Sequence, residues 1–268
     1  MATHEPIPFA TIGTGWITKS FIHAAQSTGF YKLIAVHSRS QDTSSTFAAT
    51  FATPAHGIKA YTSLDALASD PAIKLVYIAS PNSSHFPQAM ALLQAGKHVI
   101  VEKPAVLNVN EMCELQNLAE KKNLVCLEAF RHLHGPAFAA LRAGIDELGP
   151  IYGASLPYAS RSSRYEALLR GETPNVFSAE HAGGALRDLG VYSVSLAIAL
   201  WHAPERARYE PRMLATGVDG GGWLTLHYES FDVNCNVSKM WTADGQGEVY
   251  GEKGRVLIEG VADMERVV

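Results

Sequence analysis

The chain has 268 residues, 47% of them hydrophobic, so it can bury a sizeable core as one large domain or two ordinary ones. Its formal net charge is only -4, without runs of like charge, which argues against a nucleic-acid or membrane partner and favours small molecules. The start of the chain lacks a signal pattern and no apolar stretch reaches membrane-spanning length, so we expect a cytoplasmic protein.

The first half alternates short apolar runs with helical patterns. Strands are expected at residues 8–12, 32–37, 75–79, 98–101 and 124–127, and apolar residues at helical spacing predict crossover helices over 17–28, 86–93 and 112–118. Strands that alternate with helices form parallel sheets covered on both faces. We therefore predict an α/β protein whose N-terminal domain, residues 1–127, is a Rossmann dinucleotide-binding domain.

The pattern changes after residue 127. A helix over 137–147 precedes a strand-like segment over 151–158 and a loop rich in Arg and Ser, and the run Asp219–Gly222 predicts a turn. Residues 224–228 and 231–237 alternate apolar with polar side chains, as half-buried antiparallel strands do. Residues 128–268 should thus form an α+β substrate-binding domain with a mainly antiparallel open sheet. Its uncovered face, carrying Trp223 and His227, is an expected homodimer or homotetramer surface.

Two clusters invite a metal or disulfide hypothesis. The three cysteines, Cys113, Cys126 and Cys235, are odd in number and widely spaced, so we expect buried free thiols. His132, His134 and His181 fit no tight ligand spacing, so lining of the substrate site or surface exposure is preferred and no metal is expected.

A glycine-rich turn, Ile12-Gly13-Thr14-Gly15-Trp16-Ile17, follows the first predicted strand and opens a predicted helix. Gly13 permits a tight turn and Gly15 leaves room for a pyrophosphate to approach backbone N–H groups. Thr18 stands where the dinucleotide fingerprint has Gly or Ala, which weakens the match. An ordinary strand-to-helix connection remains the alternative.

The second predicted strand ends at Ser38-Arg39-Ser40, and no carboxylate appears before Asp42 to bind an adenosine ribose. Arg39 with its flanking hydroxyl groups could bind a 2'-phosphate, which favours NADP over NAD. A solvated loop arginine is the alternative.

Five segments together resemble the Gfo/Idh/MocA family of glucose-fructose oxidoreductases and inositol dehydrogenases. They are Gly13 to Ile17, Ser80-Pro81-Asn82-Ser83-Ser84-His85, Glu102-Lys103-Pro104, Glu128-Ala129-Phe130, and Gly183 to Tyr192. The tyrosine at position 192 makes the chain look most like the NADP-dependent xylose-type and dihydrodiol dehydrogenases of that family.

The resemblance implies hydride transfer between NADP, or alternatively NAD, and a sugar, polyol or diol hydroxyl carbon. It implies catalytic roles for Lys103, Asp188 and Tyr192, and a lysine beside a tyrosine lowers the tyrosine pKa by stabilising phenolate. Asp188 and Tyr192 stand four residues apart on a predicted helix and so share one face. The implied cofactor-binding residues are Gly13, Gly15, Trp16, Ile17, Ser38, Arg39, Ser80, Asn82, His85, Glu102 and Lys103.

Each residue also has a structural alternative. Lys103 could end a strand at a rigid turn, Asp188 could be a cap or ion-pair partner, and Tyr192 a core aromatic, while Ser80, Asn82 and His85 could cap a helix. A non-catalytic NAD(P)-binding sensor on the same fold is the alternative function. A glycosidase that uses bound NAD transiently is a third.

The chain departs from the family in two places. The segment after Phe130 reads Arg131-His132-Leu133-His134-Gly135-Pro136, so the family's substrate contacts do not carry over. The chain also ends at Val268, sooner than relatives usually do, so we expect either a shortened C-terminal sheet or another element that covers its edge.

Overall fold

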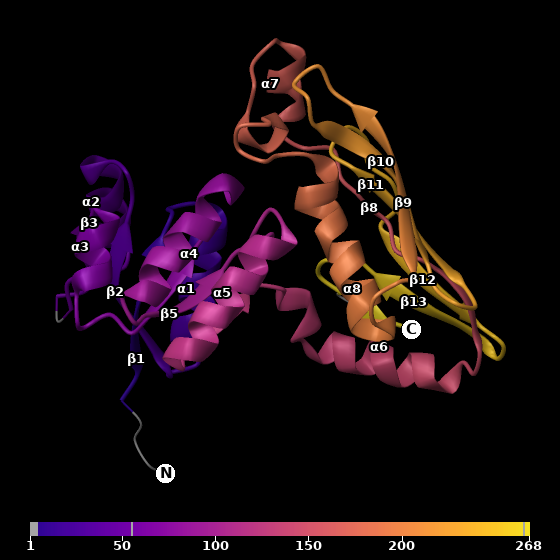
Figure 1. Ribbon diagram of the computed structural model, residues 1–268, viewed down its shortest axis with the longest axis horizontal. Coiled ribbons are helices and arrows are strands. Elements are labelled where there is room, and N and C mark those ends of the chain that lie inside the picture. The colour runs from indigo at the N-terminus through magenta and orange to yellow at the C-terminus, as the bar shows by residue number, and fades with distance from the viewer. Residues whose placement is uncertain (1–4, 55, 265) are drawn as a thin grey trace. The chain divides into compact units, whose positions relative to one another are not determined.

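The computed structural model describes residues 5–54, 56–264 and 266–268. It divides the chain into two compact units, one ending at Ala129 and the other running from Phe130 to Val268 (Figure 1). No helix in the described part of the chain is both long and apolar enough to cross a bilayer.

The first unit is built on a six-stranded parallel sheet in the order β3-β2-β1-β4-β5-β6. Its strands are β1 (Ile7–Ile12), β2 (Tyr31–His37), β3 (Lys59–Tyr61), β4 (Leu75–Ile78), β5 (His98–Val101) and β6 (Cys126–Glu128). Its helices are α1 (Trp16–Ser27), α2 (Gln41–Ala49), α3 (Leu64–Ser69), η1 (Asn82–Ser84), α4 (His85–Gln94) and α5 (Val109–Lys122). This order reverses between β1 and β4, as in a dinucleotide-binding sheet, and confirms the predicted Rossmann fold.

The apolar runs explain the central strands. All four residues of β4 are buried, as expected for a parallel strand covered on both faces. The sequence did not predict β3, because this three-residue edge strand has only exposed or half-buried side chains and no apolar run. The strand predicted over 124–127 begins later, at Cys126.

The second unit is a mixed, mostly antiparallel sheet in the order β14-β13-β12-β7-β11-β10-β9, with β8 also paired to β11. Strands β7 and β8 run parallel to β11. The strands are β7 (Ile151–Ser155), β8 (Tyr158–Ala159), β9 (Arg206–Met213), β10 (Asp219–His227), β11 (Asp232–Ser238), β12 (Gln246–Gly251), β13 (Gly254–Glu259) and β14 (Arg266–Val267). The helical segments are η2 (Arg131–Leu133), α6 (Pro136–Glu147), α7 (Tyr165–Leu169), η3 (Asn175–Phe177), η4 (Leu186–Gly190) and α8 (Val191–Trp201).

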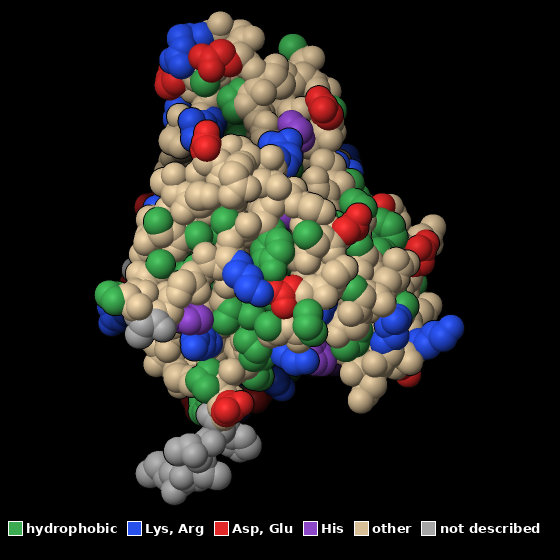
Figure 2. All heavy atoms as spheres, turned by 90° about the vertical axis from the view of Figure 1, so that its left-hand side faces the viewer, with side chains coloured by type: hydrophobic (Ala, Val, Ile, Leu, Met, Phe, Trp, Pro, Cys, Tyr) green, Lys and Arg blue, Asp and Glu red, His purple; other side chains and the backbone are tan. Residues whose placement is uncertain are grey.

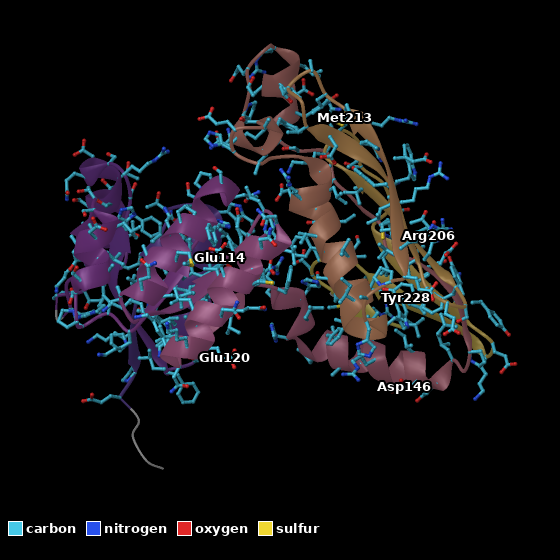
Figure 3. All side chains as sticks on the ribbon, viewed as in Figure 1. Glu114, Glu120, Asp146, Arg206, Met213 and Tyr228 are labelled. Atoms are coloured by element: carbon cyan, nitrogen blue, oxygen red, sulfur yellow. The ribbon has the colours of Figure 1, made fainter. Side chains whose placement is uncertain are left out.

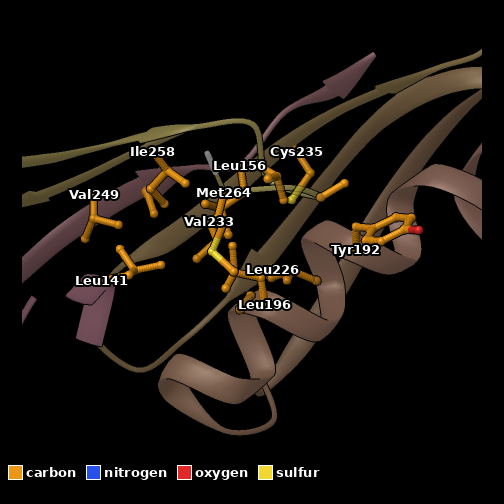
Figure 4. Packing of buried hydrophobic residues seen from close by; sticks show 14 of the residues in the cluster. Leu141, Leu156, Tyr192, Leu196, Leu226, Val233, Cys235, Val249, Ile258 and Met264 are labelled. Atoms are coloured by element: carbon orange, nitrogen blue, oxygen red, sulfur yellow. The ribbon is translucent and has the colours of Figure 1, made fainter. Parts of the chain in front are cut away.

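The alternation in β11 predicts its two faces correctly. Val233, Cys235 and Val237 are buried in the core of the second unit, where Leu196 of α8 joins the same cluster, whereas Asn234 is exposed (Figure 4). Helices α6 and α8 thus cover one face of the sheet. The buried Cys235 fits the expectation of a buried thiol, but Cys113 is exposed, so that expectation was wrong for it.

Two local predictions in this unit were wrong. The segment 151–158 forms two short strands, β7 and β8, and the loop after it contains α7. The run Asp219–Gly222 begins β10 and is not a turn. Close packing explains the glycine at position 221, because a Cβ there would lie 2.7 Å from the Trp241 ring and 2.8 Å from Ser238 Oγ.

Charged side chains of both signs are interspersed over the face shown in Figure 2, in line with the small net charge. In the second unit, Arg206 and Met213 mark the two ends of the exposed edge strand β9 (Figure 3). Neighbouring β10 presents Trp223, which is 46% exposed, stacks on Trp241 and lies under the Arg212 guanidinium.

Candidate active site

The glycine turn joins β1 to α1 in the first unit. Gly13 has φ +101°, and a Cβ on it would lie 2.4 Å from the Ala79 carbonyl oxygen, so only glycine fits where the ends of β1 and β4 approach. Gly15 is the N-cap of α1, no side chain caps that helix, and a Cβ on Gly15 would meet nothing within 4 Å. The helix start is therefore open to an anion that hydrogen-bonds backbone N–H groups.

The residues after Gly15 differ in exposure. Trp16 is 74% exposed and Ile17 is half-buried. Thr18, at the third fingerprint position, is fully buried, and its Oγ1 has no hydrogen-bond partner among the described residues. The helix–sheet packing therefore accommodates the β-branched side chain.

The loop after β2 carries the residues expected at the adenosine end of a dinucleotide. Ser38 donates its N–H to the Tyr61 carbonyl at 3.1 Å, Arg39 is exposed, and Ser40 caps α2 by accepting the N–H of Thr43 at 3.4 Å. A pocket of about 390 Å³ opens beside this loop. It is lined by Thr14, Lys19, Asp42, Thr43, Thr46, Phe47 and Thr50. It offers hydroxyl groups, one ammonium group and one carboxylate.

Glu102 and Lys103 follow β5 at the same edge of the sheet. Tyr77 donates its hydroxyl hydrogen to Glu102 Oε1 at 2.5 Å, and Glu102 Oε2 accepts the N–H of Lys103 at 3.2 Å. The Lys103–Pro104 peptide bond is cis. Glu102 thus holds the turn that presents Lys103, which is half-buried.

Glu128, at the end of β6, holds the next part of this turn. Its Oε1 accepts the N–H of Ala105 at 2.8 Å. Burial raises the pKa of Glu128, the charge of Glu102 adds to the rise, and the Ala105 hydrogen bond and Lys103 oppose it.

His85 braces the loops that follow β4 and β5. Its Nε2 lies 2.8 Å from the Ser80 carbonyl oxygen and its Nδ1 lies 2.9 Å from the Pro104 carbonyl oxygen. The ring is fully buried, and burial lowers its pKa. A cofactor role for His85 stays a prediction, and the buried ring would exert such a role through the two loops that it holds. Ser80 and Asn82 are half-buried, and Ser80 donates its hydroxyl hydrogen to Gln88.

In the second unit, two glycines and an aspartate shape the segment before α8. A Cβ on Gly183 would lie 2.6 Å from the Val176 carbonyl oxygen, and one on Gly184 would lie 2.3 Å from Asp219 Oδ1. Asp219 Oδ2 accepts the N–H of Leu186 at 2.8 Å and the Tyr209 hydroxyl hydrogen at 2.6 Å. This anchor holds the start of η4, a π-helical turn.

Asp188 lies in η4 and Tyr192 in the first turn of α8, so the predicted regular helix is replaced by a π-turn that runs into an α-helix. Such turns occur often at functional sites. The Asp188 carboxylate forms an ion pair with Lys239, which follows β11. Tyr192 is 9% exposed and lies at the end of the apolar cluster with its hydroxyl directed away from it (Figure 4).

A cation and a histidine surround Tyr192 within the second unit. Burial lowers the pKa of the Arg131 guanidinium, but its ion pair with Asp263 and its hydrogen bond to the Tyr192 side chain raise it, and the net direction is upward. The buried His132 ring lies 5.0 Å from the Tyr192 ring, centroid to centroid. Burial, followed by the charge of Arg131, lowers the pKa of His132 to about 4.

Sequence reasoning missed Lys239 and Asp219, and it treated Arg131 as a departure from the family. A signal for Lys239 was its place in the alternation, because it continues the inward-facing series of Val233, Cys235 and Val237 with a charged side chain. Within the described ranges, no group of three or more His, Cys, Asp or Glu side chains could hold a metal ion.

The strand order, the open glycine turn and the lysine after β5 define a dinucleotide-binding α/β oxidoreductase. Residues 7–130 match the family described as "Oxidoreductase family, NAD-binding Rossmann fold", and residues 140–257 match the C-terminal domain of the same family. The chain belongs to the Gfo/Idh/MocA family.

Several relatives align over most of the chain. The Escherichia coli (strain K12) oxidoreductase YgjR is 37% identical over 97% of this chain and 78% of its own. The Bacillus subtilis (strain 168) scyllo-inositol 2-dehydrogenase (NADP(+)) IolU is 36% identical over the same shares, 97% and 78%. Both exceed the 28% identity of the Mus musculus trans-1,2-dihydrobenzene-1,2-diol dehydrogenase, which covers 92% of this chain and 73% of its own.

The fold is also shared with solved structures. The crystal structure of GenD2 from gentamicin A biosynthesis, in complex with NAD, superposes with a TM-score of 0.84 at 24% identity, covering 97% of this chain and 74% of that one. At this identity the likeness concerns the fold.

Proposed function

We propose that this protein is an NADP-dependent dehydrogenase that moves a hydride between the nicotinamide and a hydroxyl-bearing carbon of a sugar, polyol or diol. The observation that carries the proposal is the position of Lys103. It follows β5 at the carboxyl edge of the same parallel sheet that holds the Gly13–Gly15 turn. Ligands of open parallel sheets bind outside the carboxyl ends of the strands, where the strand order reverses.

The first unit fits the dinucleotide. Gly13 and Gly15 would admit the pyrophosphate at the start of α1, where a Cβ on Gly15 meets no neighbour. A bound nicotinamide would supply the hydride acceptor. Trp16, Ile17, Ser80, Asn82 and Glu102 remain proposed cofactor neighbours, and His85 acts through the loops it braces.

Ser38 and Arg39 are proposed to bind the adenosine 2'-phosphate. The neighbouring pocket adds the Lys19 ammonium and threonine hydroxyl groups, which suit a phosphate. Asp42 lines the same pocket and could instead accept hydrogen bonds from ribose hydroxyls, so NAD is the alternative cofactor. We prefer NADP because IolU, which is 36% identical, is named as an NADP(+) enzyme.

The chemical roles follow from the side chains. Removing a hydroxyl proton as hydride leaves carbon needs a base and a group that stabilises the developing alkoxide. We assign the proton to Tyr192, whose hydroxyl interacts with the Arg131 guanidinium, and the stabilising charge to Lys103. Asp188 would accept hydrogen bonds from substrate hydroxyl groups. The name of IolU supports an inositol-like cyclic polyol as the first substrate to try.

A screen of inositols, aldoses and diols for NADP⁺ reduction, followed by absorbance of the reduced cofactor, tests this proposal. Net reduction with a polyol or sugar is the expected result. Cofactor binding without turnover of any compound would favour the sensor alternative. Substrate cleavage with tightly retained cofactor and no net reduction would favour the glycosidase.

We further propose a homodimer or homotetramer formed through the uncovered face of the second unit's sheet. Trp223 is 46% exposed there, while His227 is paired with Asp232 and is the weaker candidate for a contact. Light scattering at micromolar concentration should give a mass above that of one chain, and a strictly monomeric species would contradict it.

A further inference from the structure

Lys239 is a buried cation that the proposed chemistry does not yet use. Only 5% of the residue is exposed. Its N–H donates to the Gly220 carbonyl at 2.8 Å and its carbonyl accepts the N–H of Ser162 at 2.9 Å. The backbone is thus held from both sides, and the side chain reaches Asp188.

The ion pair is unevenly exposed. The Lys239 side chain is 6% exposed, whereas that of Asp188 is 27% exposed. The ammonium also lies 6.0 Å from the centroid of the Phe177 ring. The cation is therefore enclosed, and the carboxylate stands at the surface of the second unit, where a small molecule can reach it.

A lysine is a costly choice for such a place. Burying an ammonium group is energetically costly, and a well-packed apolar side chain often gives equal or greater stability. The pair also joins β11 to a π-turn whose start is already held by Asp219. Stability alone therefore gives little reason for a charge at position 239.

We infer that Lys239 is a positioning residue for Asp188, keeping its carboxylate ionised and in one orientation for the hydroxyl groups of a polyol substrate. The inference rests on the proposed function, in which Asp188 receives those hydroxyl groups. Lys239 supplies a positive charge directly at the Asp188 carboxylate, with which it forms an ion pair. The elements packed on η4 also carry Asp219 of β10, Tyr158 of β8 and Tyr192 of α8.

The test compares Lys239→Met with the charge-retaining Lys239→Arg in the full chain. Carboxyl carbon NMR, with the Asp188 signal assigned through Asp188→Asn, follows protonation without any need for activity. Loss of a nearby positive charge should raise the pKa of Asp188 by about one unit or more in Lys239→Met. Lys239→Arg should keep the wild-type titration, and so should a control, Lys253→Met, which alters an exposed lysine.

Kinetics then connect the inference to the reaction. On a substrate found by the screen, Lys239→Met should raise KM by about tenfold or more. The KM of Lys239→Arg should lie close to that of the wild type. An Asp188 titration unchanged in Lys239→Met overturns the inference, whether or not a substrate is found. If Lys239→Met does not fold, Lys239→Gln is titrated instead, and an unchanged Asp188 titration in that variant overturns the inference. Failure of the substrate screen alone would reject the dehydrogenase and leave the NMR result to decide the link between Lys239 and Asp188.

Discussion

Gly13 lies directly against Ala79: a Cβ on Gly13 would stand 2.4 Å from the Ala79 carbonyl oxygen, and φ is +101°. A side chain there meets a backbone atom that cannot turn aside, and the dihedral angle itself is strained for other residues. The two glycines of the turn therefore have different reasons to be glycine, which a pair of variants can separate.

Gly13→Ala should lower the free energy of unfolding by at least about 1–3 kcal/mol, the usual cost of such backbone strain. Gly15→Ala should cost less, up to about 1 kcal/mol, because its Cβ meets nothing within 4 Å and only the preference of the N-cap for glycine over alanine is lost. It should still weaken both NAD(H) and NADP(H) by about tenfold, because the methyl group occupies space for the pyrophosphate. Denaturant unfolding and cofactor fluorescence measure the two effects. Wild-type cofactor affinity in Gly15→Ala would contradict the dinucleotide site.

Arg39→Ala should weaken NADP(H) by about ten- to a hundredfold, the range expected when a hydrogen bond to a charged group is lost. NAD(H) should bind almost as before, because it lacks the 2'-phosphate. Lys32→Ala, which removes an exposed cation near the other end of β2, serves as the control. Calorimetric titration with both cofactors measures the two affinities. An equal loss of affinity for NADP(H) and NAD(H) would contradict binding of the 2'-phosphate by Arg39.

Lys103→Met should reduce turnover by about two orders of magnitude or more, as expected when a group that stabilises the developing alkoxide is removed. Cofactor affinity should change far less, because the Gly13–Gly15 turn is untouched. Lys121→Met alters an exposed lysine of α5 and should match the wild type in turnover. Steady-state kinetics on a substrate from the screen measure both variants. Wild-type turnover in Lys103→Met would remove this lysine from the mechanism.

Tyr192→Phe should lose activity on a similar scale, about a hundredfold or more, if its hydroxyl carries the proton. The ring is 9% exposed and packs in the core, so the fold and its melting temperature should persist. Tyr152→Phe, at a tyrosine that is 63% exposed, controls for the loss of a hydroxyl group. Retained turnover in Tyr192→Phe would contradict this role and would make Lys103 or a histidine such as His181 the candidate proton carrier.

His132 should make the protein less stable in acid. Ser195 donates its hydroxyl hydrogen to the Val191 carbonyl, so His132 Nε2, 3.1 Å from Ser195 Oγ, must be the protonated ring nitrogen. The buried Nδ1 has no hydrogen-bond partner among the described residues and so offers a proton no acceptor.

The folded-state pKa of His132, about 4, lies below the ordinary 6.5, so the unfolded chain takes up a proton that the folded chain refuses. Its contribution to stability is complete above pH 6.5 and is lost as the pH falls toward 4, by on the order of 3 kcal/mol. Urea unfolding across this range should show a smaller loss in His132→Gln, whereas His134→Gln, at an exposed histidine, should behave as wild type. Identical pH dependence in both variants would refute the assignment.

Local patterns in the sequence were enough to predict much of the fold. The apolar strands of the first unit, the alternation in β11 and the glycine turn each depend on residues close together in the chain. Burial on two faces demands continuous apolar runs, and burial on one face demands alternation. Lys103 could be placed after β5 for the same reason. The short edge strand β3 was not predicted, because it buries too few side chains to produce an apolar run or an alternation.

The tertiary structure decided the contacts around Asp188 and Tyr192. Lys239 stands 51 residues from Asp188, and Asp263 stands 132 residues from Arg131. No periodicity selects one partner over that distance, because such a pair forms only when the β11 end and the π-turn are brought together by packing. The run Asp219–Gly222 shows the same limit: its composition indicates a turn, whereas close contacts with Trp241 and Ser238 place glycine inside a strand. Local propensity is worth less than such packing when the two conflict.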